Sequence, residues 1–316
     1  MKVLIVCSSN VENFDFKIHQ AFIYEQIESL KLYFNTEYDT FFIKGKGITG
    51  YLKNLHGLNK KIKSFTPYIV HAHYGLSGLL ACLQRKAPVV ITFHGSDAYL
   101  LMVRLLSKIA AGLSRFNIFI SDNVQDKIKG NKRYSVVPCG INLDVFYPID
   151  MKIAREKLEL ETEKKYILFS SSFDNSVKNS PLAFSAIEKL QMNHELIELK
   201  NRSREEVNLL LNACNLLLLT SKTEGSPQII KEAMACNCPI VATDVGDIKE
   251  VIGKTAGCYI TSFEPDDVAD KIKLTIKSDR RTNGREMIKH LDNKLIAEKI
   301  YKIYKNVVEG KDDYSN

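Results

Sequence analysis

One stretch, residues 220–251, constrains the fold more than any other part of the sequence. It follows the apolar run Leu216 to Leu219, which has the length and composition of a buried strand. A polar loop then leads to Ser226-Pro227 and to a helix predicted to end near Cys236. We expect Ser226 to be the N-cap and Pro227 the first helical residue. Because Pro239 to Ala242 predicts a further buried strand, the stretch reads as a repeating unit of a parallel α/β sheet.

The start of this predicted helix suits a phosphate or a sugar hydroxyl, because its first amides lack intrahelical acceptors and carry the positive end of the helix dipole. Glu224 lies in the loop just before it, and Glu232 follows eight residues later in the second turn. The arrangement predicts two carboxylates beside one crevice. The alternative is that both are ordinary surface acids, since carboxylates are usually exposed.

The same residues resemble glycosyltransferase family 4, whose members are retaining enzymes of the GT-B architecture. The resemblance rests on Glu-Gly-x-Pro, a second Glu followed by Ala, and the run Pro-Ile-Val-Ala-Thr-Asp-Val-Gly, which here starts at Pro239. It implies that Glu224 and the loop after it bind the donor sugar, and that Glu232 binds the ribose hydroxyls. That loop consists of Gly225, Ser226 and Pro227.

A second segment also carries the resemblance. His94 directly follows the predicted strand Pro88 to Phe93, at the end where open parallel sheets place ligands. The run Thr-Phe-His-Gly-Ser-Asp resembles the family motif whose His lines the reaction centre, so His94 is assigned to positioning near the anomeric carbon; the alternative is a structural His. We assign the acceptor side to Ser9, Asn10, Tyr74 and Asp97. His71 and His73 share a strand face and are expected to pack there rather than to bind a metal.

The diphosphate of the donor is expected to meet the loop after the predicted strand Tyr166 to Ser170. Family members offer an Arg and a Lys there; Lys178 matches the Lys, whereas Ser172 stands near the Arg position. The rest of the diphosphate charge is expected to be neutralised by the helix start at Ser226 or by a basic residue elsewhere. The alternative for Lys178 is a solvated loop lysine. Arg202 ends the loop where the family holds the nucleotide base. The glycine-rich turn common in the family is absent from residues 8–16.

Alternating strands and helices over 316 residues predict two facing Rossmann-like domains with parallel sheets. Residues 1–148 form the expected acceptor-side domain and residues 149–290 the nucleotide-sugar domain. The hinge is placed near Pro148, at the end of the segment that starts at Pro138. Residues 291–316 are expected to be a helix that crosses back to the first domain, with a frayed tail from Lys311.

The net charge of +7 is concentrated in the first half of the chain, where residues 1–148 hold 18 Lys and Arg against 10 Asp and Glu. This basic excess predicts an anionic partner, either a membrane surface or a phosphorylated acceptor. No nucleic-acid partner is expected. The amphipathic segment Tyr51 to Phe65 predicts a helix that either covers the sheet or lies on a membrane. The apolar segment Ala98 to Leu113 is too short and too charged to span a bilayer.

The absence of a signal-peptide pattern and the odd number of scattered cysteines favour a cytoplasmic protein, peripheral on the inner face of the plasma membrane. The sequence predicts a retaining hexosyltransferase that moves a sugar from a nucleotide diphosphate sugar, UDP-sugar favoured over GDP-sugar, to an acceptor hydroxyl. The acceptor is a carbohydrate or a lipid-linked sugar of bacterial cell-surface polysaccharide or glycolipid synthesis. No metal or other cofactor is expected. The alternatives are a sugar-nucleotide epimerase of the same fold and a non-catalytic nucleotide-sugar-binding homologue.

Overall fold

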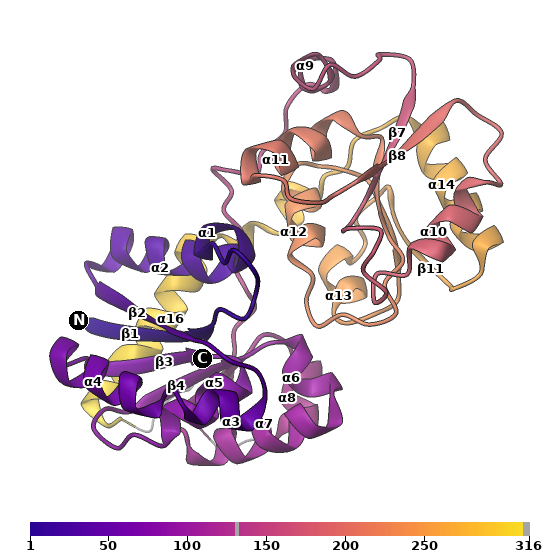
Figure 1. Ribbon diagram of the computed structural model, residues 1–316. Helices are drawn as coiled ribbons and strands as arrows, with labels where there is room; N and C mark the ends of the chain where they lie inside the picture. Colours follow the sequence, from indigo (N-terminus) through magenta and orange to yellow (C-terminus); the bar gives the residue numbers. More distant parts are fainter. Residues whose placement is uncertain (130–132, 312–316) are drawn as a thin grey trace. The chain divides into compact units, whose positions relative to one another are not determined.

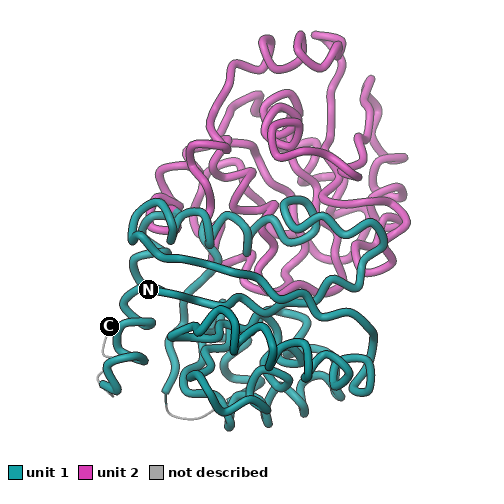
Figure 2. Tube along the Cα trace, turned by 60° about the vertical axis from the view of Figure 1, so that its left-hand side comes forward, with its two compact units in different colours: residues 1–140, 293–316 teal, residues 141–292 magenta. Residues whose placement is uncertain are grey.

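The computed structural model describes residues 1–129 and 133–311 of the chain, so the predicted tail beyond Lys311 lies outside the described residues (Figure 1). The chain divides into two compact units, coloured separately in Figure 2. The first unit contains Met1–Gly140 and the last helix, α16 (Asn293–Glu309). The second unit is Ile141–Asp292. Two parallel-sheet α/β units, predicted from the sequence, are therefore confirmed.

The sheet of the first unit has six parallel strands in the order β2-β1-β3-β4-β5-β6. They are β1 (Lys2–Ser8), β2 (Glu37–Ile43), β3 (Ile69–His73), β4 (Val89–Phe93), β5 (Phe116–Phe119) and β6 (Tyr134–Val136). The central strands β3 and β4 are buried along their whole length, as expected of a parallel sheet covered on both faces. The chain order reverses at β1, which pairs with both β2 and β3, so this sheet has its switch point there.

Helices connect these strands. They are α1 (Phe16–His19), α2 (Ala21–Phe34), α3 (Gly47–Leu52), α4 (Leu55–Phe65), α5 (Gly75–Cys82), α6 (Gly95–Tyr99), α7 (Leu101–Leu113) and α8 (Asp122–Ile128). The last helix, α16, packs on α2 through buried Ile296, Ile300 and Tyr304, which confirms its predicted return to the first unit.

The segment predicted as one helix from Tyr51 to Phe65 is instead two helices, α3 and α4, separated at Lys53 and Asn54. The Asn54 amide donates to the carbonyls of Lys44 and Gly50 (both 2.8 Å), which ties the break to the end of β2. The loop predicted around Gly45 to Gly50 also contains the first turn of α3. Leu58 and Ile62 of α4 are buried in the core, so α4 covers the sheet.

The sheet of the second unit has five parallel strands in the order β11-β10-β9-β7-β8. They are β7 (Lys165–Phe169), β8 (His194–Glu198), β9 (Leu216–Leu219), β10 (Ile240–Thr243) and β11 (Cys258–Thr261). The helices are α9 (Met151–Lys157), α10 (Ser180–Ile187), α11 (Arg204–Ala213), α12 (Gln228–Ala235), α13 (Ile248–Ile252), α14 (Pro265–Ser278), α15 (Gly284–Met287) and the short 3-10 helix at Lys289–Leu291. Because β7 pairs with both β8 and β9, the chain order reverses there, which creates a switch point at the carboxyl ends of β7 and β9.

The boundary between the units falls after Gly140, not after Pro148 as the sequence suggested. Ile141 and Phe146 are fully buried in the core of the second unit. The backbone N–H of Tyr147 donates to the Asn208 side chain at 3.2 Å, which fixes this segment to α11. This segment therefore belongs to the second unit, because its buried contacts lie there, and Pro148 does not mark the boundary.

Helix α12 begins at Gln228, and its N-cap is Pro227 rather than Ser226. Pro227 has an extended backbone (φ −70°, ψ 119°), so the chain enters the helix one residue later than predicted. The predicted cap by Ser226 is wrong, because this hydroxyl is buried beside Asp247 instead.

Two glycines in helices of the first unit provide a matched test of this packing. A Cβ on Gly78 of α5 would lie 2.5 Å from Ile91 Cδ1, whereas a Cβ on Gly112 of α7 would meet nothing within 4 Å. We predict that Gly78→Ala lowers the free energy of unfolding by about 1–3 kcal/mol through overpacking. Gly112→Ala should raise it by about 0.5–1 kcal/mol. Urea unfolding checks both; equal effects would contradict the packing of α5 on the sheet.

Candidate active-site residues of the two units

The loops after β7 and β9 are joined at the switch point of the second unit. The buried Thr220 hydroxyl donates to the carbonyls of Lys178 (3.0 Å) and Asn179 (3.1 Å). Lys178 Nζ lies 2.6 Å from Glu224 Oε1, which also accepts from the Ser221 hydroxyl at 2.6 Å. Both charged side chains are largely buried, with 20% and 13% of their surface exposed. Lys178 and Glu224 are thus brought together, and neither is a free surface residue.

Glu232 is the second predicted carboxylate, and the structure buries it on α12 with only 5% of its side chain exposed. Arg204, the first residue of α11, places Nη1 2.5 Å from Glu232 Oε1. The Arg204 guanidinium also lies over the Phe146 ring, 4.4 Å from its centroid. The alternative that Glu232 is a surface acid is therefore wrong. Nothing in the sequence near Arg204 indicates this contact, because only the fold brings the start of α11 to Glu232.

The turn after β10 packs against the loop that holds Glu224. A Cβ on Gly246 would lie 2.7 Å from the Gly225 carbonyl oxygen, so only glycine allows this close approach. Burial raises the pKa of Asp247 in the same turn, while Lys231 and the Ser226 hydroxyl oppose the shift. Lys231 is fully buried on α12. Its only signal in the sequence is a charge inside an otherwise apolar helix face.

Ser172 and Arg202 were also predicted to bind the sugar donor, but neither contacts Lys178, Glu224 or Glu232 through a hydrogen bond or ion pair of its side chain. The Ser172 hydroxyl donates to the carboxylates of Asp174 and Glu198, so its immediate neighbours are acids. Lys200, which follows β8, pairs with Asp174 at 2.8 Å and so brings to this loop a cation that was not among the predicted site residues. Arg202 forms an exposed pair with Glu206 one helical turn away (3.2 Å). Arg204 rather than Arg202 reaches Glu232.

His94 in the first unit lies at the carboxyl end of β4 and is the N-cap of α6. Its backbone N–H donates to Asp97 Oδ2 at 2.7 Å, and its ring packs on Phe22 and Tyr74 with centroids 5.1 and 4.5 Å apart. His94 Nε2 lies 3.2 Å from His73 Nδ1. The ring is therefore held by the fold on several sides, as a positioning role requires.

His71 and His73 are buried on β3, and the prediction that they pack there is consistent with their contacts. His71 bonds the Tyr304 hydroxyl (2.6 Å) and the Thr92 hydroxyl (2.7 Å). Burial lowers the pKa of both rings, for His71 to about 3, so both are neutral near pH 7. The contact between His73 Nδ1 and His94 Nε2 holds a single proton, so one of these nitrogens donates and the other accepts.

Tyr74 is the N-cap of α5, and Asp97 lies in the first turn of α6. Tyr74 has φ +72° and ψ 147°, a conformation that costs a bulky residue about 1–3 kcal/mol and that persists only when its surroundings impose it. The two Asp97 oxygens accept from the backbone N–H groups of Gly75 (2.8 Å) and His94 (2.7 Å). Asp97 therefore couples the carboxyl ends of β3 and β4.

Ser9 and Asn10 form bonds within the fold. The Ser9 hydroxyl donates to the Ile43 carbonyl at 3.2 Å. The Asn10 side chain accepts from the Gly45 N–H (2.7 Å) and donates to the Gly45 carbonyl (2.8 Å). These contacts replace a glycine-rich turn by joining the end of β1 to the end of β2.

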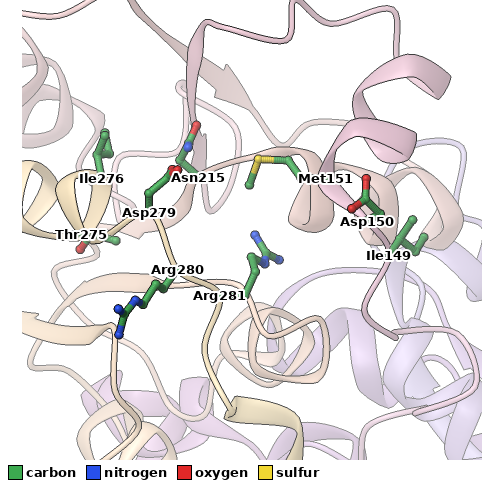
Figure 3. Close-up of a pocket in the computed structure, with 9 residues that line it drawn as sticks. All are labelled: Ile149, Asp150, Met151, Asn215, Thr275, Ile276, Asp279, Arg280 and Arg281. Atoms are coloured by element: carbon green, nitrogen blue, oxygen red, sulfur yellow. The ribbon is translucent and has the colours of Figure 1, made fainter.

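A cavity of about 280 Å³ lies in the second unit, away from these residues (Figure 3). It is lined by Asn215, which precedes β9, so it lies at the amino end of the sheet. Arg281 also lines it, and its guanidinium caps the C-terminal ends of α11 and α12 by donating to the carbonyls of Leu211, Cys214 and Cys236. None of the predicted site residues lines this cavity.

Residues 1–129 and 133–311 lack two features, a metal-binding cluster and a membrane-spanning helix. No group of three His, Cys, Asp or Glu side chains in this part of the chain has an arrangement that could hold a metal ion. No helix there combines the length and the apolar character needed to cross a bilayer.

Comparison with known proteins identifies the class. A family described as Glycosyl transferases group 1 matches residues 183–294, and Glycosyltransferase Family 4 matches residues 24–145. These matches make the protein a glycosyltransferase, and its two parallel-sheet units agree with the GT-B architecture. Two glycosyltransferase family models thus match, one mainly in each unit, which confirms the resemblance to glycosyltransferase family 4 seen in residues 220–251.

Three known proteins illustrate the similarity. An uncharacterized glycosyltransferase of Methanocaldococcus jannaschii is 26% identical over 303 residues, 84% of this chain and 82% of the relative. The N,N'-diacetylbacillosaminyl-diphospho-undecaprenol alpha-1,3-N-acetylgalactosaminyltransferase of Campylobacter jejuni is 22% identical over 213 residues, and the match spans 58% of this chain and 57% of that relative. The structure of Anabaena HepE in complex with UDP and glucose has a TM-score of 0.77 at 15% identity and covers 97% of this chain and 100% of its own.

The pair of arginines around α11 gives a direct test of the Glu232 contact. We predict that Arg204→Ala lowers the free energy of unfolding by about 3 kcal/mol, because it leaves a buried carboxylate without its cation. Arg202→Ala, which removes an exposed pair, should change it by less than about 0.5 kcal/mol. Chemical denaturation of both variants checks the difference, and a neutral Arg204→Ala would show that Glu232 is not held by this pair.

Asp97 predicts a pH dependence of stability. Burial raises the pKa of its carboxyl from 3.8 to about 7, despite the N–H groups of Gly75 and His94 that lower it. Between these two pH values the folded chain binds more protons than the unfolded chain. The contribution of Asp97 to the free energy of unfolding therefore falls as the pH rises from about 4 to about 7 and is constant above that.

Urea unfolding of the wild type and of Asp97→Asn, which does not titrate, isolates this contribution. The stability difference, wild type minus variant, should decline across that pH range. A difference that grows with pH would show that the native pKa of Asp97 is lowered instead.

Proposed function

We propose that the protein is a retaining glycosyltransferase that moves a hexose from a UDP-sugar to an acceptor hydroxyl without a metal ion. The observation that carries the proposal is the Lys178–Glu224 pair at the switch point of the second unit. A cation and an acid, both largely withdrawn from water, lie where open parallel sheets bind ligands. The pair offers one group for a diphosphate and another for sugar hydroxyls.

Donor binding would separate this pair. Lys178 turns to the diphosphate, and Glu224 then accepts hydrogen bonds from the sugar. The amides of Gly225 and Ser226, just before α12, supply further donors. Glu232, with Arg204 beside it, is proposed to accept from the ribose hydroxyls. UDP is favoured over GDP as the nucleotide because HepE, which shares the fold, was solved with UDP and glucose.

The proposed reaction breaks the bond between the anomeric carbon and the diphosphate oxygen and forms a bond from the acceptor oxygen to the same carbon. The acceptor attacks from the face that the diphosphate leaves, so the configuration is retained, and its proton passes to the departing phosphate oxygen. Lys178 neutralises charge on the departing diphosphate, and such electrostatic stabilisation is often the largest catalytic contribution. His94, held by His73 and the Asp97 contact, positions the reacting sugar.

The acceptor is proposed to be a carbohydrate or a lipid-linked sugar of bacterial cell-surface polysaccharide or glycolipid synthesis. The name of the Campylobacter jejuni relative contains a diphospho-undecaprenol acceptor, and the first half of this chain has the basic excess that an anionic acceptor or membrane attracts. The protein would then act in the cytoplasm, at the inner face of the plasma membrane.

Replacement of Glu224 tests the donor site. We predict that Glu224→Ala lowers kcat/KM for transfer from a UDP-sugar by on the order of 10²–10³-fold, because a polar contact to the reacting sugar is lost. Glu205→Ala removes an exposed acid of α11 and serves as the matched control. Transfer is measured by UDP release with a panel of acceptors, and NMR of the product gives the anomeric configuration.

Unchanged turnover in Glu224→Ala would refute the role of Glu224, and an inverted product would refute retention. Loss of activity in EDTA, restored by a divalent cation, would refute the metal-independent mechanism. Stabilisation of the wild type by UDP but not by GDP in thermal unfolding is expected. A chain that neither binds a nucleotide nor releases UDP would be a non-catalytic homologue.

A further inference from the structure

The helix α7 presents a line of large apolar side chains to solvent. Leu101, Leu105, Ile109 and Leu113 are four residues apart, so they lie on one side of the helix. Their exposed fractions are 61%, 48%, 53% and 60%, and Met102 beside them is 66% exposed. Scattered exposed leucines are normal, but a continuous line of this kind marks an interaction surface.

The opposite side of α7 is packed with small residues. Ser107, Ala110 and Ala111 are its buried positions, and a Cβ on Gly75 of α5 would lie 2.0 Å from the Ser107 hydroxyl oxygen. The helix therefore lies so close to α5 that only small side chains fit between the two. A surface helix ordinarily buries its large apolar residues; α7, at the outer edge of the first unit in Figure 1, instead leaves this line of them exposed.

The charged residues of this segment of the chain are all positive. Residues 98–121 contain Arg104, Lys108 and Arg115 and no Asp or Glu. Arg104 and Lys108 are also four residues apart and run beside the apolar line. In the part of the chain that the structure describes, neither forms an ion pair. An apolar line bordered by cations matches the boundary between acyl chains and anionic headgroups.

A second copy of this chain fits the surface less well. A two-fold interface places the same patch on both partners. The two rows of cations would then approach each other with no acid of α7 to separate them. Helix α4, the membrane helix suggested by the sequence, also fits less well, because Leu58 and Ile62 on its apolar side are already buried against the sheet.

From these features we infer that α7 docks the first unit on an anionic bilayer surface, with the side chains of Leu101, Leu105, Ile109 and Leu113 inserted below the headgroups. Helix α6, which begins at the His94 motif, leads directly into α7. A lipid-linked acceptor would thereby be delivered to the residues around His94. This last step rests on the proposed function, whereas the docking itself does not.

Vesicle binding by the full chain tests the inference. Co-sedimentation is measured with vesicles of phosphatidylcholine alone and with added phosphatidylglycerol, at low and high salt. We expect binding only to the anionic vesicles and weaker binding at high salt. Leu105→Gln/Ile109→Gln should weaken it by about tenfold or more. Arg104→Gln/Lys108→Gln should weaken it by on the order of fivefold for each cation at low salt.

Matched controls remove similar groups elsewhere. Leu32→Gln/Leu274→Gln replaces two exposed leucines outside α7, and Lys60→Gln/Lys63→Gln removes two cations of α4. Both controls should bind vesicles like the wild type. The inference fails if the wild type does not bind anionic vesicles, or if the α7 variants bind as well as the controls. It also fails if analytical ultracentrifugation shows that Leu105→Gln/Ile109→Gln only converts a dimer to a monomer.

Donor binding distinguishes this inference from the proposed function. The α7 variants should keep the thermal stabilisation by UDP, because the residues that bind the donor lie in the second unit. If the wild type binds anionic vesicles but shows no stabilisation by UDP and no transfer, the docking surface stands and the proposed function fails. The reverse result removes only the docking surface.

Discussion

The contact between Lys178 and Glu224 is the interaction on which the site depends. It joins the loops after β7 and β9, which leave the sheet where the chain order reverses. The Thr220 hydroxyl holds the first of these loops by donating to the carbonyls of Lys178 and Asn179. Because both charges are largely removed from water, their attraction is stronger than that of a surface pair, and separating them requires a ligand that replaces each partner. A nucleotide diphosphate sugar has the two groups that would do so.

The first unit holds its candidate site residues by a different set of contacts. Its switch point has no glycine-rich turn, and Ser9 and Asn10 are bonded to the end of β2 instead. Chemistry-bearing residues lie at the ends of β3 and β4, where Asp97 joins two backbone amides and His73 contacts the His94 ring. The strained backbone of Tyr74 lies among these contacts. Buried polar groups in such a network fix one another, so His94 has a defined orientation before any substrate arrives.

Docking through the apolar line of α7 would relate the fold to the proposed acceptor. Helix α7 packs on the first unit through the small residues Ser107, Ala110 and Ala111, so this packing buries little apolar surface. Its large apolar side chains contribute a favourable free energy of burial only when another surface covers them. Coupling the covering surface to α6 would bring the start of that helix, and therefore His94, close to lipid headgroups. Such docking would agree with the basic excess in the first half of the chain.

The sequence by itself determined the order of strands and helices, the two parallel sheets and the positions of Glu224 and Glu232. These follow from periodicity and from a motif within one stretch, and both are local properties of the chain. Local signals also misplaced some details: Ser226 is not the N-cap, and residues 141–148 join the second unit, because buried contacts outweigh turn preferences.

Only the tertiary structure decided which partners these residues have. Arg204 meets Glu232 across 28 positions of sequence, and Lys178 meets Glu224 across 46. The burial of Lys231 and the outward direction of the leucines of α7 likewise depend on which elements pack against those helices. Such contacts arise between residues far apart in the chain, and no period or motif within a single segment encodes them.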